Sequence, residues 1–377
     1  MTRFSTERSA TYIPGLDGIR AIAFLLVYGS HVGLEYLIPG GLGVTIFFFL
    51  SGYLITTLLR VEMKQSGKIS ISQFYLRRTL RIFPPMYVTL VVWMSLASLG
   101  VLVGSPHWQP IVLASVYLAN YVGALTSHRL EGGLVVLWSL SVEEHFYLLF
   151  PWLLVLFLRS RRSFRAVAPA LAGLCTVALA WRLILVLHFH SIPATTYNHT
   201  DTRFDSILFG CLLAVSLNPL LDAIPARIRR HSASLAVVGL VVLLGCLIFR
   251  GPVFRETFRY SIQGLALAPI FLFVLDSPGT WPVRFLEHPL LRFAGRRSYA
   301  MYLIHLCILD AVHAKLGVNL FWTGLISAPL VVGYSYAMWQ LVEIPIGRFK
   351  KSRFRARESR EPRWSSPDLA EQPIKQR

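Results

Sequence analysis

Apolar runs long enough, or nearly long enough, to cross a lipid bilayer recur along the whole of this chain. Ten of them lie near residues 18–36, 43–60, 82–103, 138–158, 166–188, 203–217, 233–249, 260–276, 298–315 and 321–341. A bilayer core takes about 17–25 helical residues, and each spanning segment must pair its own backbone polar groups. Only 15% of the residues are charged, whereas a soluble domain has about a quarter. The sequence therefore predicts an all-α polytopic membrane protein with about ten transmembrane helices.

The basic residues set the expected orientation of these helices. The net charge of +18 comes mainly from short loops between apolar runs and from the C-terminal end, rather than from a stripe of the kind that binds nucleic acid. With ten spans, almost all Lys and Arg fall on one side, which the positive-inside rule assigns to the cytoplasm. The exceptions are Arg129, Arg182, Arg203, Arg250, Arg255, Arg259 and Lys315. We expect a multi-pass protein of the bacterial cytoplasmic (inner) membrane, with both termini in the cytoplasm and no nucleic-acid partner.

Two segments fall outside this regular pattern. An eleventh, weaker apolar stretch at 109–124 would place the basic cluster at 159–165 opposite the basic loop at 61–81 if it crossed the membrane. It is therefore predicted to be re-entrant or interfacial. We expect residues 1–345 to form one integral membrane domain and residues 346–377 a disordered basic cytoplasmic tail close to anionic lipid headgroups.

Ionisable residues within apolar runs are costly, so each needs an explanation. Arg20 and His31 are eleven residues apart in the first run, which places them on one face of a continuous helix, with His31 near mid-membrane. Glu35 follows His31 by one turn and would orient its imidazole. A neutral imidazole at that depth is suited to proton transfer, although a hydrogen-bonded packing histidine is the alternative.

Arg78 and Arg81 are three residues apart, so they share one face of a short predicted helix at the cytoplasmic surface. Pro84 and Pro85 are expected to interrupt the chain before the third span. Two guanidinium groups on one face can bind phosphates such as those of coenzyme A. Ordinary positive-inside charge is the alternative explanation.

Carboxylates at the start of the fourth span are a further candidate. Glu143 and Glu144 are adjacent, and neighbouring helical positions point about 100° apart, so only one of them can face a given cavity. One carboxylate is expected to cap or pair, and the other to face the site. A structural ion pair explains them equally well.

Polar residues in later spans suggest a cavity that reaches both faces of the membrane. Arg182 lies in the fifth span, and Asp205 lies near the start of the sixth. Tyr302 and His305 share one face of the ninth helix with Ser298. A purely structural hydrogen-bond network is the alternative for Ser298 and Tyr302. Neither cysteine pairs nor clusters with ligand spacing occur, so no metal site is expected.

Six motifs, taken together and in this order, resemble the membrane-bound acyltransferase family 3, which includes O-antigen and exopolysaccharide O-acetyltransferases. They are YIPGLDGIRAIAFLLVYGSH, GGLGVTIFFFLSGYLI, FYLRRTLRIFPP, WSLSVEEHFYLLFP, TRFDSILFG and RRSYAMYLIH. The resemblance implies that the chain is an acyl-CoA-dependent O-acyltransferase. Acyl-CoA, expected to be acetyl-CoA, would be a donor substrate rather than a bound cofactor, and the acceptor would be a saccharide or a glycosylated metabolite.

The resemblance also implies roles for individual residues. His31 corresponds to the catalytic histidine, with Glu143 or Glu144 at an acidic position. Arg20 is the partner of His31 in the opening motif. Arg78 and Arg81 match the arginine pair implicated in acyl-CoA handling, and we expect Arg20 to assist them. We expect the acceptor-side or cavity residues to be Glu35, Arg182, Asp205, Tyr302 and His305. In many relatives, an extracytoplasmic SGNH hydrolase-like domain completes the transfer. The membrane domain of this chain is expected either to complete the transfer itself or to pass the acyl group to a partner.

Two other classes of function are alternatives to an acyltransferase. A transporter or exporter of a glycan or lipid would use His31 and the intramembrane arginines as a proton and anion relay. The sequence shows no internal repeat, which argues against that class. A purely structural membrane scaffold would leave His31 unexplained.

Overall fold

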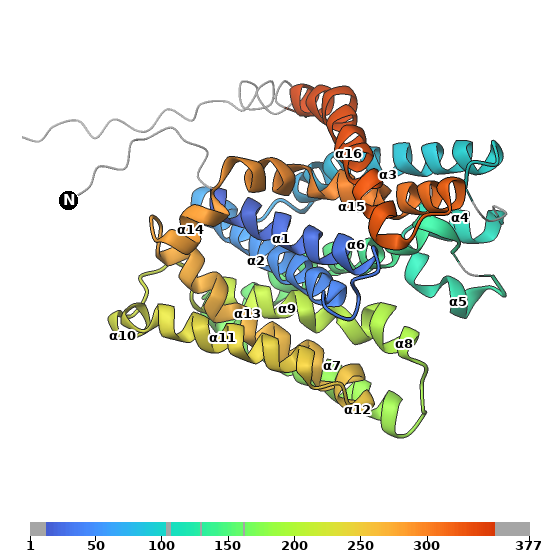
Figure 1. The fold of residues 1–377 in the computed structure, drawn as a ribbon. Coiled ribbons are helices and arrows are strands. Elements are labelled where there is room, and N and C mark those ends of the chain that lie inside the picture. The colour runs from blue at the N-terminus through green and yellow to red at the C-terminus, as the bar shows by residue number, and fades with distance from the viewer. Residues whose placement is uncertain (1–12, 103–106, 129, 161–162, 351–377) are drawn as a thin grey trace, which may run out of the picture.

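The structure is a computed structural model that describes residues 13–102, 107–128, 130–160 and 163–350. Within these ranges the regular secondary structure consists of helices without strands, which confirms the all-α class (Figure 1). The long helices are α1 (Pro14–Ser30), α2 (Gly40–Ser66), α3 (Ile71–Ser98), α6 (Leu137–Ser160), α7 (Ala168–Leu187), α9 (Thr200–Ser216), α11 (Ser232–Ile248), α13 (Phe258–Asp276), α15 (Pro289–Leu316) and α16 (Leu320–Met338).

Shorter elements connect these helices. They are α4 (Trp108–Ser115), η1 (Ala119–Tyr121), α5 (Val122–Leu125), η2 (Gly132–Val136), η3 (Phe164–Val167), α8 (Pro193–Asn198), α10 (Ala226–Arg230), α12 (Pro252–Glu256), α14 (Trp281–Leu286) and η4 (Trp339–Glu343). The predicted interfacial stretch at 109–124 thus falls into α4, η1 and α5 instead of one continuous spanning helix.

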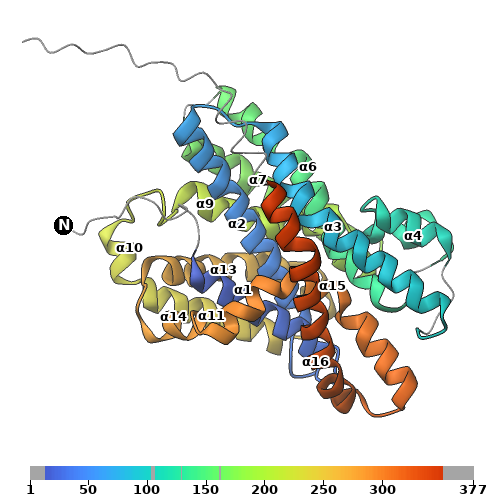
Figure 2. The same cartoon turned by 90° about the horizontal axis from the view of Figure 1, so that it is seen from above.

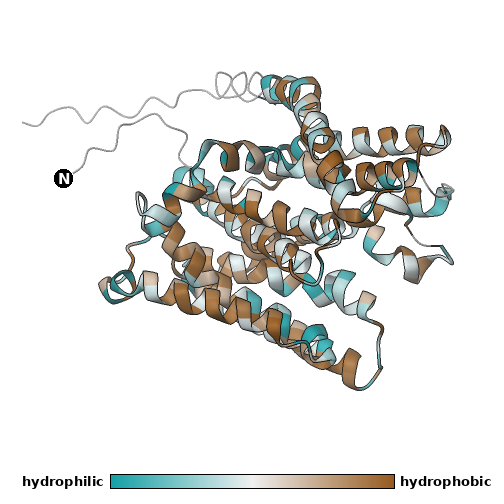
Figure 3. Ribbon diagram, in the orientation of Figure 1, coloured by the Kyte–Doolittle hydropathy of each residue, from teal (hydrophilic) through white to brown (hydrophobic). Residues whose placement is uncertain are grey.

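Seven helical segments in the described part of the chain are long and apolar enough to cross a membrane. They contain α2, α3, α6, α7, α13, α15 and α16, and α11 is a shorter apolar helix. Hydrophobic residues cover much of the length of these helices (Figure 3). The chain is therefore a polytopic membrane protein, and the predicted number of ten spans is not confirmed.

Helices α1 and α2 lie at the centre of the bundle (Figures 1 and 2). Helix α2 packs along α1 and α9, while α1 also packs along α15. In the apolar window of α2, 78% of the residues are buried, against 22% in the segment that contains α16. Most of α2 is therefore shielded by the surrounding helices.

Two glycines allow α2 and α9 to touch through their backbones. A Cβ atom at Gly52 would lie 2.0 Å from the carbonyl oxygen of Ile207, and one at Gly210 would lie 1.9 Å from that of Phe49. Small residues at such crossings let membrane helices approach closely. The close approach at Gly52 and Gly210 holds α2 against α9.

Helices α1 and α15 run parallel to one another, which brings together residues far apart in the chain. Near their first turns, a Cβ atom at Gly295 would lie 1.8 Å from the carbonyl oxygen of Asp17. At the other end, the side chains of His31 and His305 meet. The pairing of these two helices thus gives a close backbone contact at one end and the His31–His305 contact at the other.

Two expectations about helix boundaries are wrong. Helix α3 runs without a break from Ile71 to Ser98 and contains both Pro84 and Pro85, because packing of the bundle outweighs the lost backbone hydrogen bonds. Helix α1 ends at Ser30, and His31 is its C-cap residue. Glu35 therefore does not lie one helical turn beyond His31.

The C-terminal boundary also differs from the prediction. The last helical segment continues to Lys350, so residues 346–350 belong to a helix rather than to the expected tail. The turn η4, just before Pro345, is a π-helix, and such a wider turn accommodates a proline without ending the helix. Residues 351–377 of the predicted tail lie outside the described part of the chain.

Candidate functional site

His31 and His305 form a hydrogen-bonded pair between α1 and α15. The Nδ1 atom of His31 lies 3.1 Å from Nε2 of His305, and the ring centroids are 5.2 Å apart. His305 is fully buried, whereas His31 is partly exposed. The edge of the Phe24 ring packs against His305, with a centroid distance of 5.9 Å.

A backbone contact assigns the tautomers of this pair. Nδ1 of His305 lies 2.7 Å from the carbonyl oxygen of Tyr302, and a carbonyl can only accept, so this nitrogen carries the proton. In a neutral, buried His305, Nε2 is then an acceptor, and Nδ1 of His31 must donate to it. Nε2 of His31 is left with a free lone pair, as a general base requires.

The first cavity, the histidine cavity, has a volume of about 780 Å³ and is lined by His31. It is bounded by the end of α1, the 31–39 loop, the start of α2, the end of α11 and the start of α13. Its polar and aromatic lining residues are Ser30, His31, Glu35, Tyr36, Trp138, Tyr197, Asn198, Phe249, Arg250, Arg255, Glu256, Arg259, Tyr260, Gln263 and Tyr302. The volume is within the range of small-molecule sites.

The second cavity, the basic cavity, has a volume of about 370 Å³ and lies toward the opposite ends of α1 and α15. Its charged lining residues are Asp17, Arg20, Arg78, Arg81, Glu143 and Arg296. Arg20 donates to Asp17 over 2.7 Å. The guanidinium of Arg78 lies over the Tyr147 ring at 5.5 Å. The structure thus brings together the three arginines proposed for the acyl donor.

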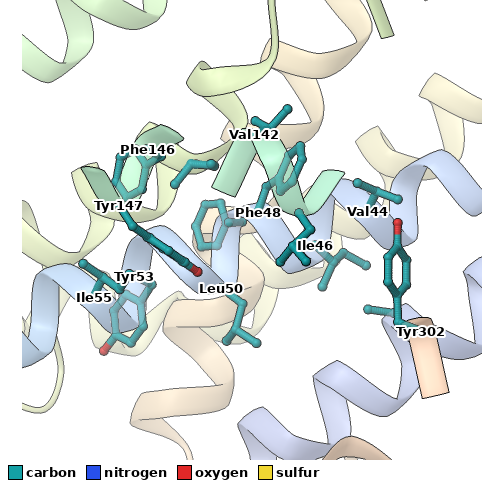
Figure 4. Close-up of a cluster of buried hydrophobic side chains, with 14 of the residues drawn as sticks. Val44, Ile46, Phe48, Leu50, Tyr53, Ile55, Val142, Phe146, Tyr147 and Tyr302 are labelled. Carbon is teal, nitrogen blue, oxygen red and sulfur yellow. The ribbon is translucent and has the colours of Figure 1, made fainter. Parts of the chain in front are cut away.

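Tyr302 and Val44 line both cavities. Both residues lie at one end of the buried cluster in Figure 4. The Tyr302 hydroxyl lies 2.7 Å from Oγ of Ser139 and 3.2 Å from the carbonyl oxygen of Val136. The side chains of Tyr302 and Val44 therefore form a wall that the two cavities share.

The adjacent carboxylates take different positions, as expected from their angular separation on α6. Glu143 lines the basic cavity, and it accepts hydrogen bonds from Ser51 over 2.7 Å and from Tyr147 over 3.2 Å. Glu144 is not among the residues that line either cavity. Glu143 is therefore the one that faces a candidate site.

Arg182 and Asp205 lie away from both cavities. The two side chains are fully buried and form a two-point ion pair, with distances of 2.9 and 2.7 Å. Ser261 bonds to both partners, and Arg182 also donates to the backbone carbonyl groups of Thr202 and Thr257. The geometry gives this pair a packing role between α7, α9 and α13, and it does not place either residue on the acceptor side.

Arg20 and His31 also do not share a cavity. Arg20 lines the basic cavity and His31 the histidine cavity. Glu35 lines the histidine cavity, but it is exposed on the loop after α1 and makes no hydrogen bond to His31 in the described structure. The partner that orients His31 is His305 instead.

Asp17, Tyr147 and Arg296 also line the basic cavity, although the sequence did not single them out. Asp17 precedes Arg20 by three positions, and Tyr147 follows Glu143 by four. Both spacings place the pairs on one helix face, so the side-chain contacts have a readable signal. Arg296 gave no such signal, because it lies within a basic run on α15.

No group of three or more His, Cys, Asp or Glu side chains could hold a metal ion in the ranges that the structure describes. The four cysteines are buried and free.

Comparison with known proteins gives a consistent set of relatives. A family model described as an acyltransferase domain matches residues 13–340. The peptidoglycan O-acetyltransferase OatA of Listeria monocytogenes is 29% identical over 91% of this chain and 57% of its own length. The O-acetyltransferase OatA of Staphylococcus aureus NCTC 8325 is 30% identical, over 94% of this chain and 60% of its own length. A putative O-acetyltransferase of S. aureus strain COL is 30% identical, over 82% and 53%.

The chain thus spans between half and two thirds of the length of these curated relatives. No solved structure gives a significant match.

Proposed function

Because this chain belongs to the acyltransferase family whose model covers residues 13–340, we propose that it is an integral membrane O-acyltransferase. It transfers an acyl group, expected to be acetyl, from acyl-CoA to a hydroxyl of a saccharide-type acceptor. The observation that carries this proposal is the His31–His305 pair at the edge of a large cavity. Its hydrogen bonds leave Nε2 of His31 as a free base.

The basic cavity is suited to the acyl donor. Arg78, Arg81 and Arg296 line it, and the structure assigns none of the three a carboxylate partner within 4.0 Å among the described residues. Guanidinium groups bind phosphates through paired hydrogen bonds. In this proposal, the phosphates of coenzyme A bind these arginines, and Arg20, neutralised by Asp17, helps to shape the cavity rather than to supply charge.

The reaction is then a base-assisted acyl transfer. His31 accepts the proton of the acceptor hydroxyl, whose oxygen attacks the thioester carbonyl. The tetrahedral intermediate collapses with cleavage of the carbon–sulfur bond, and the proton passes to the departing CoA thiolate. His305 holds the His31 ring in the required tautomer and stabilises it through Nδ1. The acyl group passes Tyr302 and Val44 to reach His31.

The charge asymmetry of the loops supports a topology for this reaction. Under the positive-inside rule, the basic cavity faces the cytoplasm, where acyl-CoA is found, and both termini are cytoplasmic. The histidine cavity then opens toward the outside of a bacterial cytoplasmic membrane. A cell-surface saccharide is accordingly the proposed acceptor, consistent with the name of the Listeria relative.

An assay of the purified protein in detergent tests the proposal. Acetyl-CoA is incubated with a panel of saccharides, the free CoA thiol is quantified, and products are identified by mass spectrometry. We expect acceptor-dependent thiol release and an O-acetylated saccharide. A transporter of a glycan or lipid would release no thiol and form no ester, and that result would contradict the proposal.

A further inference from the structure

Three arginines that depart from the charge asymmetry of the sequence meet in the histidine cavity. Arg250, Arg255 and Arg259 are among the exceptions to the predicted charge asymmetry, and all three line this cavity. They come from the loop after α11, from α12 and from the second residue of α13. Their convergence distinguishes them from scattered surface charge.

The hydrogen bonding of these arginines leaves donor groups unused. Arg250 donates to the backbone carbonyl of Tyr36 over 2.9 Å, and Arg259 donates to the Tyr260 hydroxyl over 3.1 Å. The Nε atom of Arg259 is buried and has no hydrogen-bond partner. No ion pair joins any of the three to a carboxylate in the described part of the chain.

A fourth cation lies behind the cavity wall. Arg203 is fully buried, and its guanidinium is 4.0 Å from the centroid of the Tyr260 ring. Rings of Trp138 and Tyr197, which also line the cavity, lie within 6 Å of it. Nε and Nη1 of Arg203 have no hydrogen-bond partner. A buried cation of this kind raises the positive potential in the adjacent space.

The acidic residues of the cavity offset this charge only in part. Glu35 is on the exposed loop, and Glu256 accepts a hydrogen bond from Thr196. Against these two carboxylates stand three lining arginines and Arg203 behind the wall. The cavity is thus a basic site with an aromatic wall, and sugar rings present apolar C–H faces that pack on such rings.

From this arrangement we infer that the histidine cavity binds an anionic saccharide. A carboxylate or phosphate of the acceptor pairs with Arg255 and Arg259, while the sugar ring packs against the partly exposed rings of Tyr36 and Tyr197. This inference rests on the proposed function for the identity of the acceptor, and it narrows the acceptor to saccharides that carry an oxyanion near the hydroxyl to be acylated. Neutral glycans would bind more weakly.

Binding measurements without acyl-CoA test the inference. The probes are a hyaluronan tetrasaccharide, which carries carboxylates, and the neutral chitotetraose, each titrated into purified protein by calorimetry. A second pair is N-acetylglucosamine 1-phosphate and methyl N-acetylglucosaminide. We expect an anionic probe to bind about tenfold or more tightly than its neutral counterpart, since hydrogen bonds to charged groups are worth that much. The pair that shows the preference identifies carboxylate or phosphate as the recognised group.

Substitutions then identify the arginines responsible for the preference for anionic probes. Arg255→Gln and Arg259→Gln should each remove most of it, whereas Arg284→Gln, on the exposed surface of α14 and outside both cavities, should retain it. Gel filtration and thermal unfolding verify the fold of each variant. Equal affinity for charged and neutral probes, no binding of either charged probe, or a preference that survives in the Arg255→Gln, Arg259→Gln double variant would overturn the inference. Since no acyl-CoA is present, failure of the turnover assay would not be mistaken for failure of binding.

Discussion

The Nδ1 atom of His31 lies 3.1 Å from Nε2 of His305, although the two residues are 274 positions apart in the chain. His305 in turn donates to the carbonyl oxygen of Tyr302. This sequence of hydrogen bonds leaves Nε2 of His31 as the free nitrogen. The fold achieves it by packing α1 and α15 in parallel, with Gly295 against the backbone of Asp17 at their other end.

Removing the acceptor nitrogen of His305 should impair catalysis without removing the base. His305→Phe keeps a ring in the pocket but leaves Nδ1 of His31 without its partner, so the wrong tautomer becomes accessible. We expect kcat to fall by roughly 10²-fold or more, because loss of a tautomer-fixing partner has large effects in related base systems. His305→Gln, whose side-chain oxygen can accept, should recover part of the loss. Equal kcat in the wild type and His305→Phe would show that the pair does not orient His31.

The arginines of the basic cavity should act on the acyl donor. Arg78→Gln and Arg81→Gln should raise the KM for acetyl-CoA by about tenfold each, because a charged hydrogen bond to phosphate is lost. Arg77→Gln is the matched control, since Arg77 is on the same helix but pairs with Glu62 and does not line the cavity. Steady-state kinetics over a range of acetyl-CoA concentrations measures the effect. A similar KM change in all three variants would point to general surface charge instead.

The two neighbouring carboxylates should differ in their contribution. Glu143 contacts Ser51 and Tyr147 in the basic cavity, whereas Glu144 lines neither cavity. Glu143→Gln should therefore reduce kcat/KM for acetyl-CoA by about tenfold, the scale of a lost charged hydrogen bond. Glu144→Gln should change it by less than about threefold. The reverse order would assign the acidic role to Glu144.

The buried Arg182–Asp205 pair should prove structural. Arg182→Met alone leaves a carboxylate buried without its partner, which costs about 3–5 kcal/mol of stability. In the double variant Arg182→Met, Asp205→Leu, stability should return, because apolar residues often replace such pairs without loss. Thermal unfolding in detergent and turnover are measured together. A stable double variant with no turnover would instead show that the pair is required for catalysis.

The crossing of α2 and α9 depends on the size of Gly210. Gly210→Val places a side chain where a Cβ atom already lies 1.9 Å from the carbonyl oxygen of Phe49. Overpacking of this kind costs about 1–3 kcal/mol or more, and the melting temperature should fall by several degrees. Gly173→Val is the control, because nothing lies within 4 Å of a Cβ atom at that glycine. An unchanged melting temperature for Gly210→Val would contradict the close crossing.

The sequence predicted the helical class and many of the cavity residues, for reasons of local physics. Apolar runs indicate membrane helices directly. Spacing along one helix correctly predicted that Arg78 lies close to Arg81 and that Tyr302 lies close to His305. Contacts between helices that are distant in the sequence could not be predicted from spacing or hydropathy. The pairing of His31 with His305, and of Arg182 with Asp205 away from the cavities, depends on which helices pack together.

The positions at which helices end were the other feature that the sequence predicted wrongly. The end of α1 at Ser30 moves Glu35 onto a loop, and the hydropathy of the 18–36 run does not reveal it. Conversely, Pro84 and Pro85 lie within α3, because the surrounding bundle maintains the helix. Hydropathy reports which residues avoid water, and it is weakly sensitive to where a helix stops.

The most direct test of the central claim is the acetyl-CoA turnover of wild type beside His31→Ala, with the best acceptor from the saccharide panel. His188→Ala is the control, since that histidine is exposed beyond the end of α7 and lines neither cavity. The account predicts O-acetylated product from wild type and from His188→Ala, and a loss of about 10²–10⁴-fold in His31→Ala, the usual contribution of a general base. A folded His31→Ala protein that forms product at the wild-type rate would contradict the account.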